Sequence, residues 1–223
     1  MEAFEYRGRV IYSTALDAPM LVAGCRLGRG GNSAMTVPAL VDGLLPFGRH
    51  HVTLDDVRAA FVDDPAFGTS RSRSVIWEHF ERANELLQTV VTVHAAWIGG
   101  SYTTDKVNPR DIDVVHVVDA DDRVARSDPE RRIVESFDRR VVDPLTGHLV
   151  PEHGLLVDSF VVDWAPHLPP VTTNLEYQRY AGTRGYWDDW WMRRRSGSKK
   201  DPPKRGDAIP ARGYLEVQFS AYA

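Results

Sequence analysis

The chain has 223 residues, of which 43% are hydrophobic and 26% charged, and this length and composition predict an ordinary globular protein with a substantial buried core. The formal net charge of -4 excludes a protein that coats nucleic acid through bulk positive charge, although a local basic patch can still bind phosphates. A single cysteine, Cys25, excludes an intrachain disulfide, and because the sequence shows neither a signal peptide nor an apolar run of membrane-spanning length, we expect a cytoplasmic protein without a membrane partner.

Residues 1–34 are interpreted as an N-terminal extension to a domain that spans residues 35–223. Two segments of the extension, "FEYRGRVIYS" and "PMLVAG", have the composition of short strands, whereas the glycine-rich segment "GCRLGRGGNSA" is typical of a loop. Met35 then begins a stretch with the character of a protein start. The extension is therefore either an accessory hairpin or a poorly ordered segment, and the sequence leaves both alternatives open.

Two helices are predicted in the first part of the domain. Thr53, followed three residues later by Asp56, has the pattern of a helix cap ahead of apolar residues, and this helix should end near residues 63–68. Ser70 or Ser72 is a suitable cap for a second, longer helix. Its apolar side chains recur at intervals of three and four residues, namely Ile76, Phe80, Ala83, Leu87 and Val90.

Most of the remaining apolar segments predict strands. Strands are expected over residues 93–100, which read "VHAAWIGG", and over residues 111–119, which read "DIDVVHVVD". After a polar segment and a helix over residues 133–142, further strands are expected over residues 153–166 and 213–219. No internal repeat is present, so the simplest fold class is α+β, with a small mixed or antiparallel sheet flanked by helices.

Two aspartates that are one residue apart, Asp111 and Asp113, lie on the second predicted strand. Side chains alternate across a strand, so both carboxylates project from one face while Ile112 projects from the other. Two anions this close repel each other unless a cation compensates, and hard oxygen ligands suit Mg²⁺ better than Zn²⁺. The pair therefore predicts a divalent metal site.

A glycine-glycine-serine turn precedes the two aspartates. Gly99 and Gly100 allow the backbone to approach a ligand closely, and Ser101 with the amides that follow can donate hydrogen bonds to phosphate oxygens. A phosphate site is thus predicted beside the metal site.

Residues 98–115, which read "IGGSYTTDKVNPRDIDVV", resemble the nucleotidyltransferase signature of the DNA polymerase beta superfamily. That signature is a hydrophobe, glycine, glycine or serine, a spacer of roughly ten residues, and then aspartate, hydrophobe, aspartate or glutamate, hydrophobe. Here nine residues separate Ser101 from Asp111. The resemblance extends from about Leu44 to the C-terminus, where the layout is similar to a group of small, largely uncharacterised bacterial and phage-encoded proteins.

The resemblance implies a nucleotidyltransferase-like core with a third carboxylate on a later strand. Asp158 in "LLVDSFVV" is the best match to that position, and Asp163 is the fallback. Carried over from the family, Asp111, Asp113 and Asp158 would bind two Mg²⁺ ions, and Asp158 would also help to activate an acceptor hydroxyl.

The resemblance also implies a site for the triphosphate of an incoming nucleotide. Gly100 and Ser101, with Gly99 just before them, would hold the β- and γ-phosphates. Thr104 and Lys106 lie in the spacer and are candidates for additional phosphate contacts, although no family residue matches them.

By this resemblance the expected reaction is transfer of a nucleoside monophosphate from a nucleoside triphosphate to a hydroxyl of a protein, an RNA such as a tRNA end, or a small molecule. Related small transferases include toxins of toxin–antitoxin and phage-defence systems, which would make an antitoxin a partner. The alternatives are a non-catalytic nucleotide- or nucleic-acid-binding module of the same fold and a purely structural interaction protein.

Other notable residues have a plain structural interpretation beside the functional one. The tryptophans in "YWDDWW" form either a base-stacking surface or part of the core. His116 projects away from the aspartates and is expected to be a packed or hydrogen-bonded strand residue. A dense basic run is either a solvated loop or a contact for RNA or nucleotide phosphates, and it comprises Arg193, Arg194, Arg195, Lys199, Lys200, Lys204 and Arg205.

Overall fold

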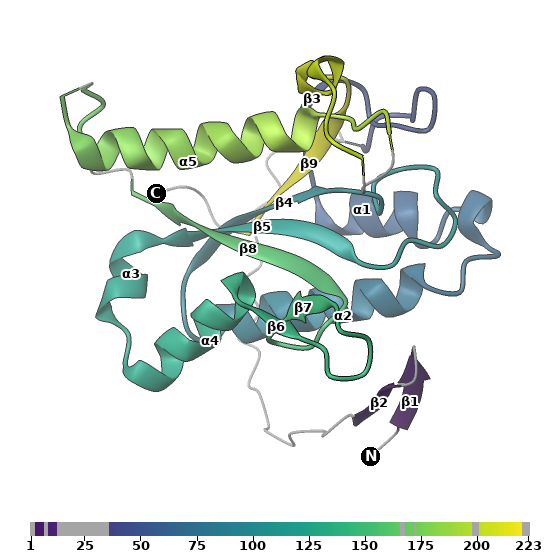
Figure 1. Ribbon diagram of the computed structural model, residues 1–223, viewed down its shortest axis with the longest axis horizontal. Coiled ribbons are helices and arrows are strands. Elements are labelled where there is room, and N and C mark those ends of the chain that lie inside the picture. Colours follow the sequence, from purple (N-terminus) through teal and green to yellow (C-terminus); the bar gives the residue numbers. More distant parts are fainter. Residues whose placement is uncertain are drawn as a thin grey trace, which may run out of the picture.

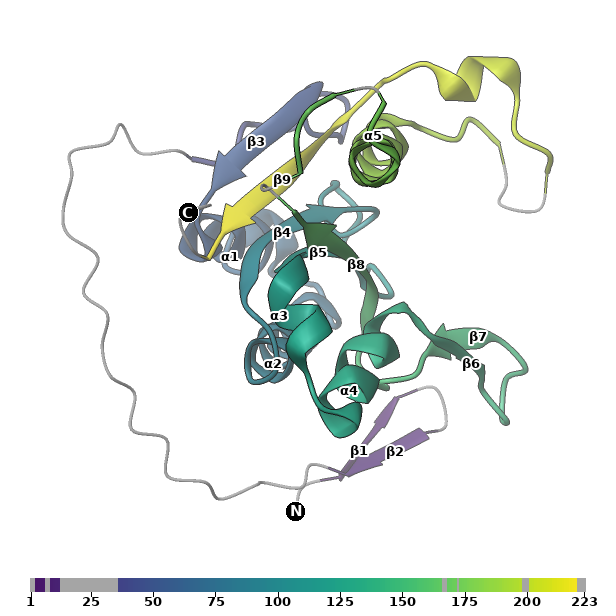
Figure 2. The same cartoon turned by 90° about the vertical axis from the view of Figure 1, so that its left-hand side faces the viewer.

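The computed structural model describes residues 36–165, 168–171, 173–197 and 201–219, together with the backbone of residues 3–6 and 9–12. Within these ranges the chain forms a mixed α+β fold, in which helices pack on both faces of one five-stranded sheet (Figures 1 and 2). The α+β prediction with a mixed sheet flanked by helices is confirmed at this level.

The central sheet has the strand order β3-β9-β4-β5-β8, with β3 and β8 at its edges. The two outer pairs, β3 with β9 and β5 with β8, are parallel, whereas β4 is antiparallel to both of its neighbours. The bounds are Gly48–Val52 for β3, Val93–Gly99 for β4, Ile112–Asp119 for β5, Val157–Trp164 for β8 and Gly213–Gln218 for β9. Strand β3 was not predicted from the sequence.

Helices α1 and α2 pack on one face of the sheet and helix α5 on the other. The helices are α1 Leu54–Phe61, α2 Arg73–Gln88, α3 Ala120–Ala125, α4 Asp128–Asp138 and α5 Leu175–Met192, with short 3-10 turns at Pro65–Phe67 and Arg205–Ala208. Within the described ranges, none of the helices combines the length and the apolar composition that a bilayer crossing requires.

The predicted helix starts follow local hydrogen bonds. The Thr53 hydroxyl accepts the Asp56 N–H at 3.1 Å, and the Asp56 carboxylate accepts the Thr53 N–H at 2.9 Å, which is a reciprocal capping box that begins α1. At α2 both predicted serines take part. Ser72 occupies the cap position, and the hydroxyl of Ser70 accepts the N–H groups of Ser72 and Arg73 at 3.3 and 3.2 Å.

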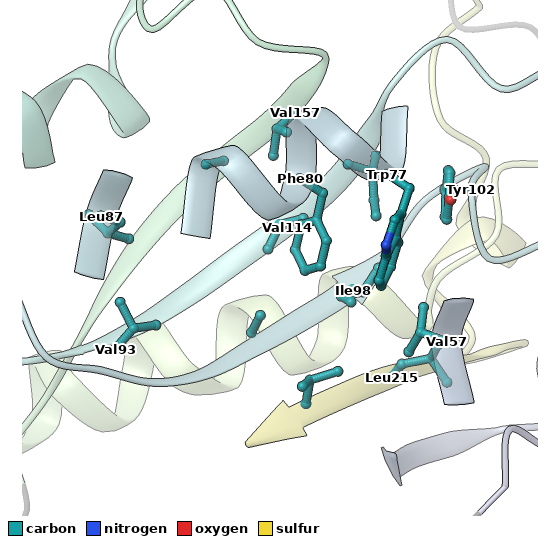
Figure 3. Close-up of a cluster of buried hydrophobic side chains, with 14 of the residues drawn as sticks. Val57, Trp77, Phe80, Leu87, Val93, Ile98, Tyr102, Val114, Val157 and Leu215 are labelled. Carbon is teal, nitrogen blue, oxygen red and sulfur yellow. The ribbon is translucent and has the colours of Figure 1, made fainter. Parts of the chain in front are cut away.

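The main core lies between α2 and the sheet. Figure 3 shows Trp77, Phe80 and Leu87 of α2 facing Ile98 of β4 and Val114 of β5. All five are buried, and burying one such side chain contributes about 1.5–3 kcal/mol. The apolar residues spaced three and four apart in α2 therefore form the face of this helix that packs on the sheet.

The second half of the chain departs from the predicted boundaries. The helix expected over residues 133–142 runs instead from Asp128 to Asp138, because Ser127 and Glu130 form a capping box at its start. The residues after it form β6 (Arg140–Val142), which pairs with β7 (Leu149–Pro151) in a small antiparallel hairpin. Helices α3 and α5 were not predicted.

The N-terminal segment contains a two-stranded antiparallel pair, β1 (Ala3–Tyr6) and β2 (Arg9–Tyr12). Apart from Ala3, both strands lie within the first candidate segment, "FEYRGRVIYS". The second candidate strand, "PMLVAG", the glycine-rich segment and Met35 lie outside the described residues. The domain boundary between residues 34 and 35 stays a prediction.

Candidate active site

Register places two predicted acids side by side. Asp113 of β5 lies opposite Gly99 on β4 and opposite Asp158 on β8. Directly paired residues on neighbouring strands point to the same face, and adjacent strands lie about 4.8 Å apart. The carboxylates of Asp113 and Asp158 therefore share the face that α5 covers. Asp111 precedes β5 by one residue and, like the other two, is partly exposed.

The turn after β4 is pressed against Asp113. Gly100 has a φ of +69°, and a Cβ atom at this position would lie 1.6 Å from Oδ2 of Asp113. Only glycine accommodates both the left-handed backbone and this approach. The Gly100 backbone and the Asp113 carboxylate are thus in direct contact.

Gly99 is required for a different reason. A Cβ atom on Gly99 would lie 2.8 Å from Cε3 of Trp191, a buried residue at the end of α5. The side of Gly99 that faces α5 is therefore filled by an indole ring. The two glycines bring the turn close to a carboxylate on one side and to a packed helix on the other.

Arg212 connects the turn, the helix end and Asp113. Its Nη1 donates to the Gly100 carbonyl at 3.1 Å, and its Nε donates to the Trp191 carbonyl at 3.0 Å. Burial lowers the pKa of Arg212, and the negative charge of Asp113 opposes part of that shift. Arg212 remains a cation, so it compensates Asp113 and fixes the turn at the same time. No sequence pattern pointed to this arginine.

Arg140 of β6 compensates Asp158. Its Nη2 donates to Asp158 Oδ1 at 2.5 Å and to the Ser159 carbonyl at 2.8 Å. The guanidinium also lies over the Phe160 ring, 4.6 Å from its centroid. No sequence pattern pointed to this arginine either, because residue 140 was expected in a helix.

A buried arginine fixes the spacer between Ser101 and Asp111. Arg73 at the start of α2 is 1% exposed, and burial lowers its pKa to about 10. Its guanidinium lies 3.8 Å from the centroid of the Phe67 ring. It donates to four main-chain carbonyls, those of Phe61, Tyr102, Thr104 and Lys106, at 3.2, 2.8, 2.8 and 2.7 Å.

The two spacer residues proposed as phosphate contacts differ in what they do. The Thr104 hydroxyl donates to the Ser101 carbonyl at 2.8 Å and accepts the Lys106 N–H at 3.3 Å. It is therefore part of the internal bonding of the spacer. The Lys106 side chain is exposed, and its phosphate-binding role stays a prediction.

The acids provide the right donor chemistry for Mg²⁺, since carboxylate oxygens are its preferred protein ligands. Within the described ranges, however, no three His, Cys, Asp or Glu side chains are gathered as a group ready to hold a metal ion. Asp158 is turned to Arg140. The residues present fit the ion by type and by strand register.

A known family model matches most of the chain, including the residues described above. Residues 38–218 match the model of a family of unknown function, DUF6932. The chain belongs to this family. No curated protein and no solved structure matches it. The matched span of DUF6932 contains the turn, the spacer, the three acids and all three arginines.

The fallback acid lies elsewhere in this DUF6932 chain. Asp163 is opposite Val118, at the far end of the β5–β8 pair, and is bound by Arg123 at 2.8 Å. An offset of five residues from Asp158 also places it on the other face of β8. The register therefore favours Asp158 over Asp163 as the partner of Asp113.

The remaining sequence features of the DUF6932 chain divide between core and surface. His116 is fully buried and its Nε2 lies 3.1 Å from Asn84 Oδ1, which confirms it as a packed strand residue. Trp191 is core, whereas Trp190 is 52% exposed. Of the basic run, Lys199 and Lys200 lie outside the described residues.

Proposed function

We propose that this chain is a magnesium-dependent nucleotidyltransferase, which transfers a nucleoside monophosphate from a nucleoside triphosphate to an acceptor hydroxyl. One observation carries the proposal. Gly99, Asp113 and Asp158 lie in register on three adjacent strands, with the Gly100 backbone against the Asp113 carboxylate. A glycine turn and paired acids at the same end of three adjacent strands suit an ion that bridges protein and polyphosphate.

Asp111, Asp113 and Asp158 would hold Mg²⁺, which when bound supplies positive charge to the triphosphate and to the departing pyrophosphate. The Ser101 hydroxyl and the neighbouring amides bind phosphate oxygens. Arg73 keeps the spacer in place, because one guanidinium holds three spacer carbonyls, those of Tyr102, Thr104 and Lys106. Most of the rate enhancement in such chemistry comes from positioning and electrostatics.

Asp158 is the residue proposed to accept the proton of the acceptor hydroxyl. It lies on the edge strand β8 and is partly exposed, so an acceptor can approach it from solvent. The acceptor is a protein, an RNA or a small molecule. A toxin or phage-defence role with an antitoxin as partner is part of the same proposal.

The test uses labelled nucleoside triphosphates, Mg²⁺ and cell extract, with label transfer and pyrophosphate release as readouts. We expect Asp113→Asn to reduce transfer by at least about 100-fold, since loss of a metal ligand removes several kcal/mol of transition-state stabilisation. Asp163→Asn is the matched control on β8, and transfer should be unchanged. Full activity in Asp113→Asn contradicts the proposal.

The second candidate is a non-catalytic nucleotide-binding module of the same fold. The ion pair between Arg140 and Asp158 favours it, because a carboxylate already bound by a guanidinium is a weaker metal ligand. Triphosphate with Mg²⁺ that raises the melting temperature without turnover in any extract would support this candidate.

A further inference from the structure

Arg140 occupies the open edge of the sheet at the candidate site. Strand β8 is an edge strand, and the junction between α4 and β6 covers it in place of a further strand. The Val161 N–H donates to Asp138 Oδ1 at 2.8 Å, and Arg140 donates to the Ser159 carbonyl at 2.8 Å. Edge strands are commonly protected by such contacts. The additional bond from Arg140 to Asp158 is not needed for this protection.

The bond from Arg140 to Asp158 offsets the repulsion between two neighbouring carboxylates. Asp113 and Asp158 are neighbours on one face, and two adjacent carboxylates repel unless positive charge lies beside them. Arg212 is the partly buried cation near Asp113, and it is held by the Gly100 and Trp191 carbonyls. Arg140 supplies the second positive charge, at Asp158.

Both arginines are held by main-chain carbonyls, but they connect different parts of the fold. Arg212 is bonded to the turn and to the helix end, so its displacement would disrupt both. The Arg140 side chain is 20% exposed and that of Asp158 is 38% exposed. Arg140 pairs with Pro151 at one end of the two-stranded β6–β7 hairpin. Besides Ser159, Arg140 donates to the Phe137 and Arg139 carbonyls at 3.2 and 3.3 Å, so its bond to the partly exposed Asp158 is the one that an anion entering from solvent can replace.

We propose that Arg140 competes with the divalent cation for Asp158 and releases it to a polyphosphate. In the ligand-free protein the guanidinium holds Asp158. When a triphosphate binds, Arg140 forms bonds to its phosphate oxygens, for which a planar guanidinium is well suited, and Asp158 becomes available to the metal. Metal and triphosphate then bind with positive coupling, so each raises the affinity for the other by the same factor. This inference rests on the proposed function.

The experiment measures Mn²⁺ binding by titration calorimetry, with and without a saturating non-hydrolysable ATP or GTP analogue. In the unmodified chain the analogue should raise the Mn²⁺ affinity by about tenfold or more. Arg140→Gln should raise the Mn²⁺ affinity without nucleotide by about tenfold and abolish most of the coupling. A role limited to edge protection would leave both quantities unchanged.

Arg123→Gln is the matched control, because Arg123 also binds an aspartate of β8, Asp163, at 2.8 Å. It should leave Mn²⁺ affinity and coupling as they are. Arg140→Lys keeps the charge but loses the planar fork, and it covers the case in which the glutamine variant does not fold. A folded Arg140→Lys protein should show a smaller rise in Mn²⁺ affinity, and an unchanged affinity would overturn the inference.

Asp113→Asn separates failure of this inference from failure of the proposed function. If Asp113→Asn abolishes Mn²⁺ binding while Arg140→Gln changes nothing, the site stands and the role of Arg140 is wrong. If the unmodified chain binds neither Mn²⁺ nor the analogue, the proposed function and the inference both fail.

Discussion

At the scale of single residues, the close contact between Gly100 and Asp113 restricts position 100 of the candidate site to glycine. Position 100 has a φ of +69°, and a Cβ atom there would also lie 1.6 Å from Oδ2 of Asp113. Another glycine has a positive φ but no atom close to its Cβ position. Gly147 has a φ of +70° with nothing within 4 Å of its Cβ position.

We expect alanine at these two glycine positions to have different effects on stability and on Mn²⁺ affinity. Gly147→Ala should lower the free energy of unfolding by about 1 kcal/mol, the cost of a left-handed alanine. Gly100→Ala should cost about 1–3 kcal/mol, because the Asp113 carboxylate must also move. Urea unfolding measures both. Mn²⁺ affinity should fall only in Gly100→Ala, and equal Mn²⁺ affinities in the two variants would contradict the contact with Asp113.

At the scale of elements, Arg73 ties helix α2 to the spacer after β4. Its guanidinium is buried against Phe67 and bonded to main-chain carbonyls. A buried cation of this kind costs free energy by desolvation and is stabilising only while its acceptors are in place. The spacer is thus held by main-chain contacts with an arginine, together with side-chain bonds of its own such as those of Thr104 and Asn108.

The second prediction concerns this link. Arg73→Met leaves several buried carbonyls without a donor, so the free energy of unfolding should fall by about 2–4 kcal/mol. Hydrogen exchange over residues 101–106 should become faster. Arg58→Met is the control, since Arg58 is half exposed and pairs with Asp63 at 3.4 Å. It should change stability by less than about 0.5 kcal/mol, and an equal loss in both variants would count against the role of Arg73.

At the scale of the whole molecule, three histidines make stability depend on pH. His116 is fully buried, and burial followed by the charge of His153 lowers its pKa to about 3. Burial, followed by Arg140 and His79, lowers the pKa of His153 to about 4. The pKa of His79 is also lowered, by burial and then by Arg82. The folded chain therefore holds these imidazoles in the neutral form.

The third prediction follows from these directions. An unfolded histidine titrates near pH 6.5, so below that pH the unfolded chain binds more protons than the folded one. Stability is then fully present above about pH 6.5 and falls as the pH drops towards 4, by on the order of a few kcal/mol. Melting temperatures between pH 7 and 4 measure the decline. His116→Gln should make it shallower, whereas a change at the exposed His148 should not. An equally steep decline in His116→Gln would contradict this account.

The sequence by itself determined those features that depend on neighbouring residues. Thr53 and Asp56 begin α1, the spacing of Ile76, Phe80 and Leu87 gives the buried face of α2, and alternation puts His116 on the opposite face from Asp113. Each of these follows from a local hydrogen bond or from a repeat of 3.6 or 2 residues.

Tertiary structure alone decided what surrounds the candidate acids. The register of β5 with β8 put Asp158, and not Asp163, beside Asp113. Arg140 and Arg212 reach those acids from segments separated in sequence, and such pairs leave no periodic pattern because they depend on how distant elements pack. The local sequence determines which residues can contribute to a site, whereas strand register and packing determine which charged side chains lie next to one another.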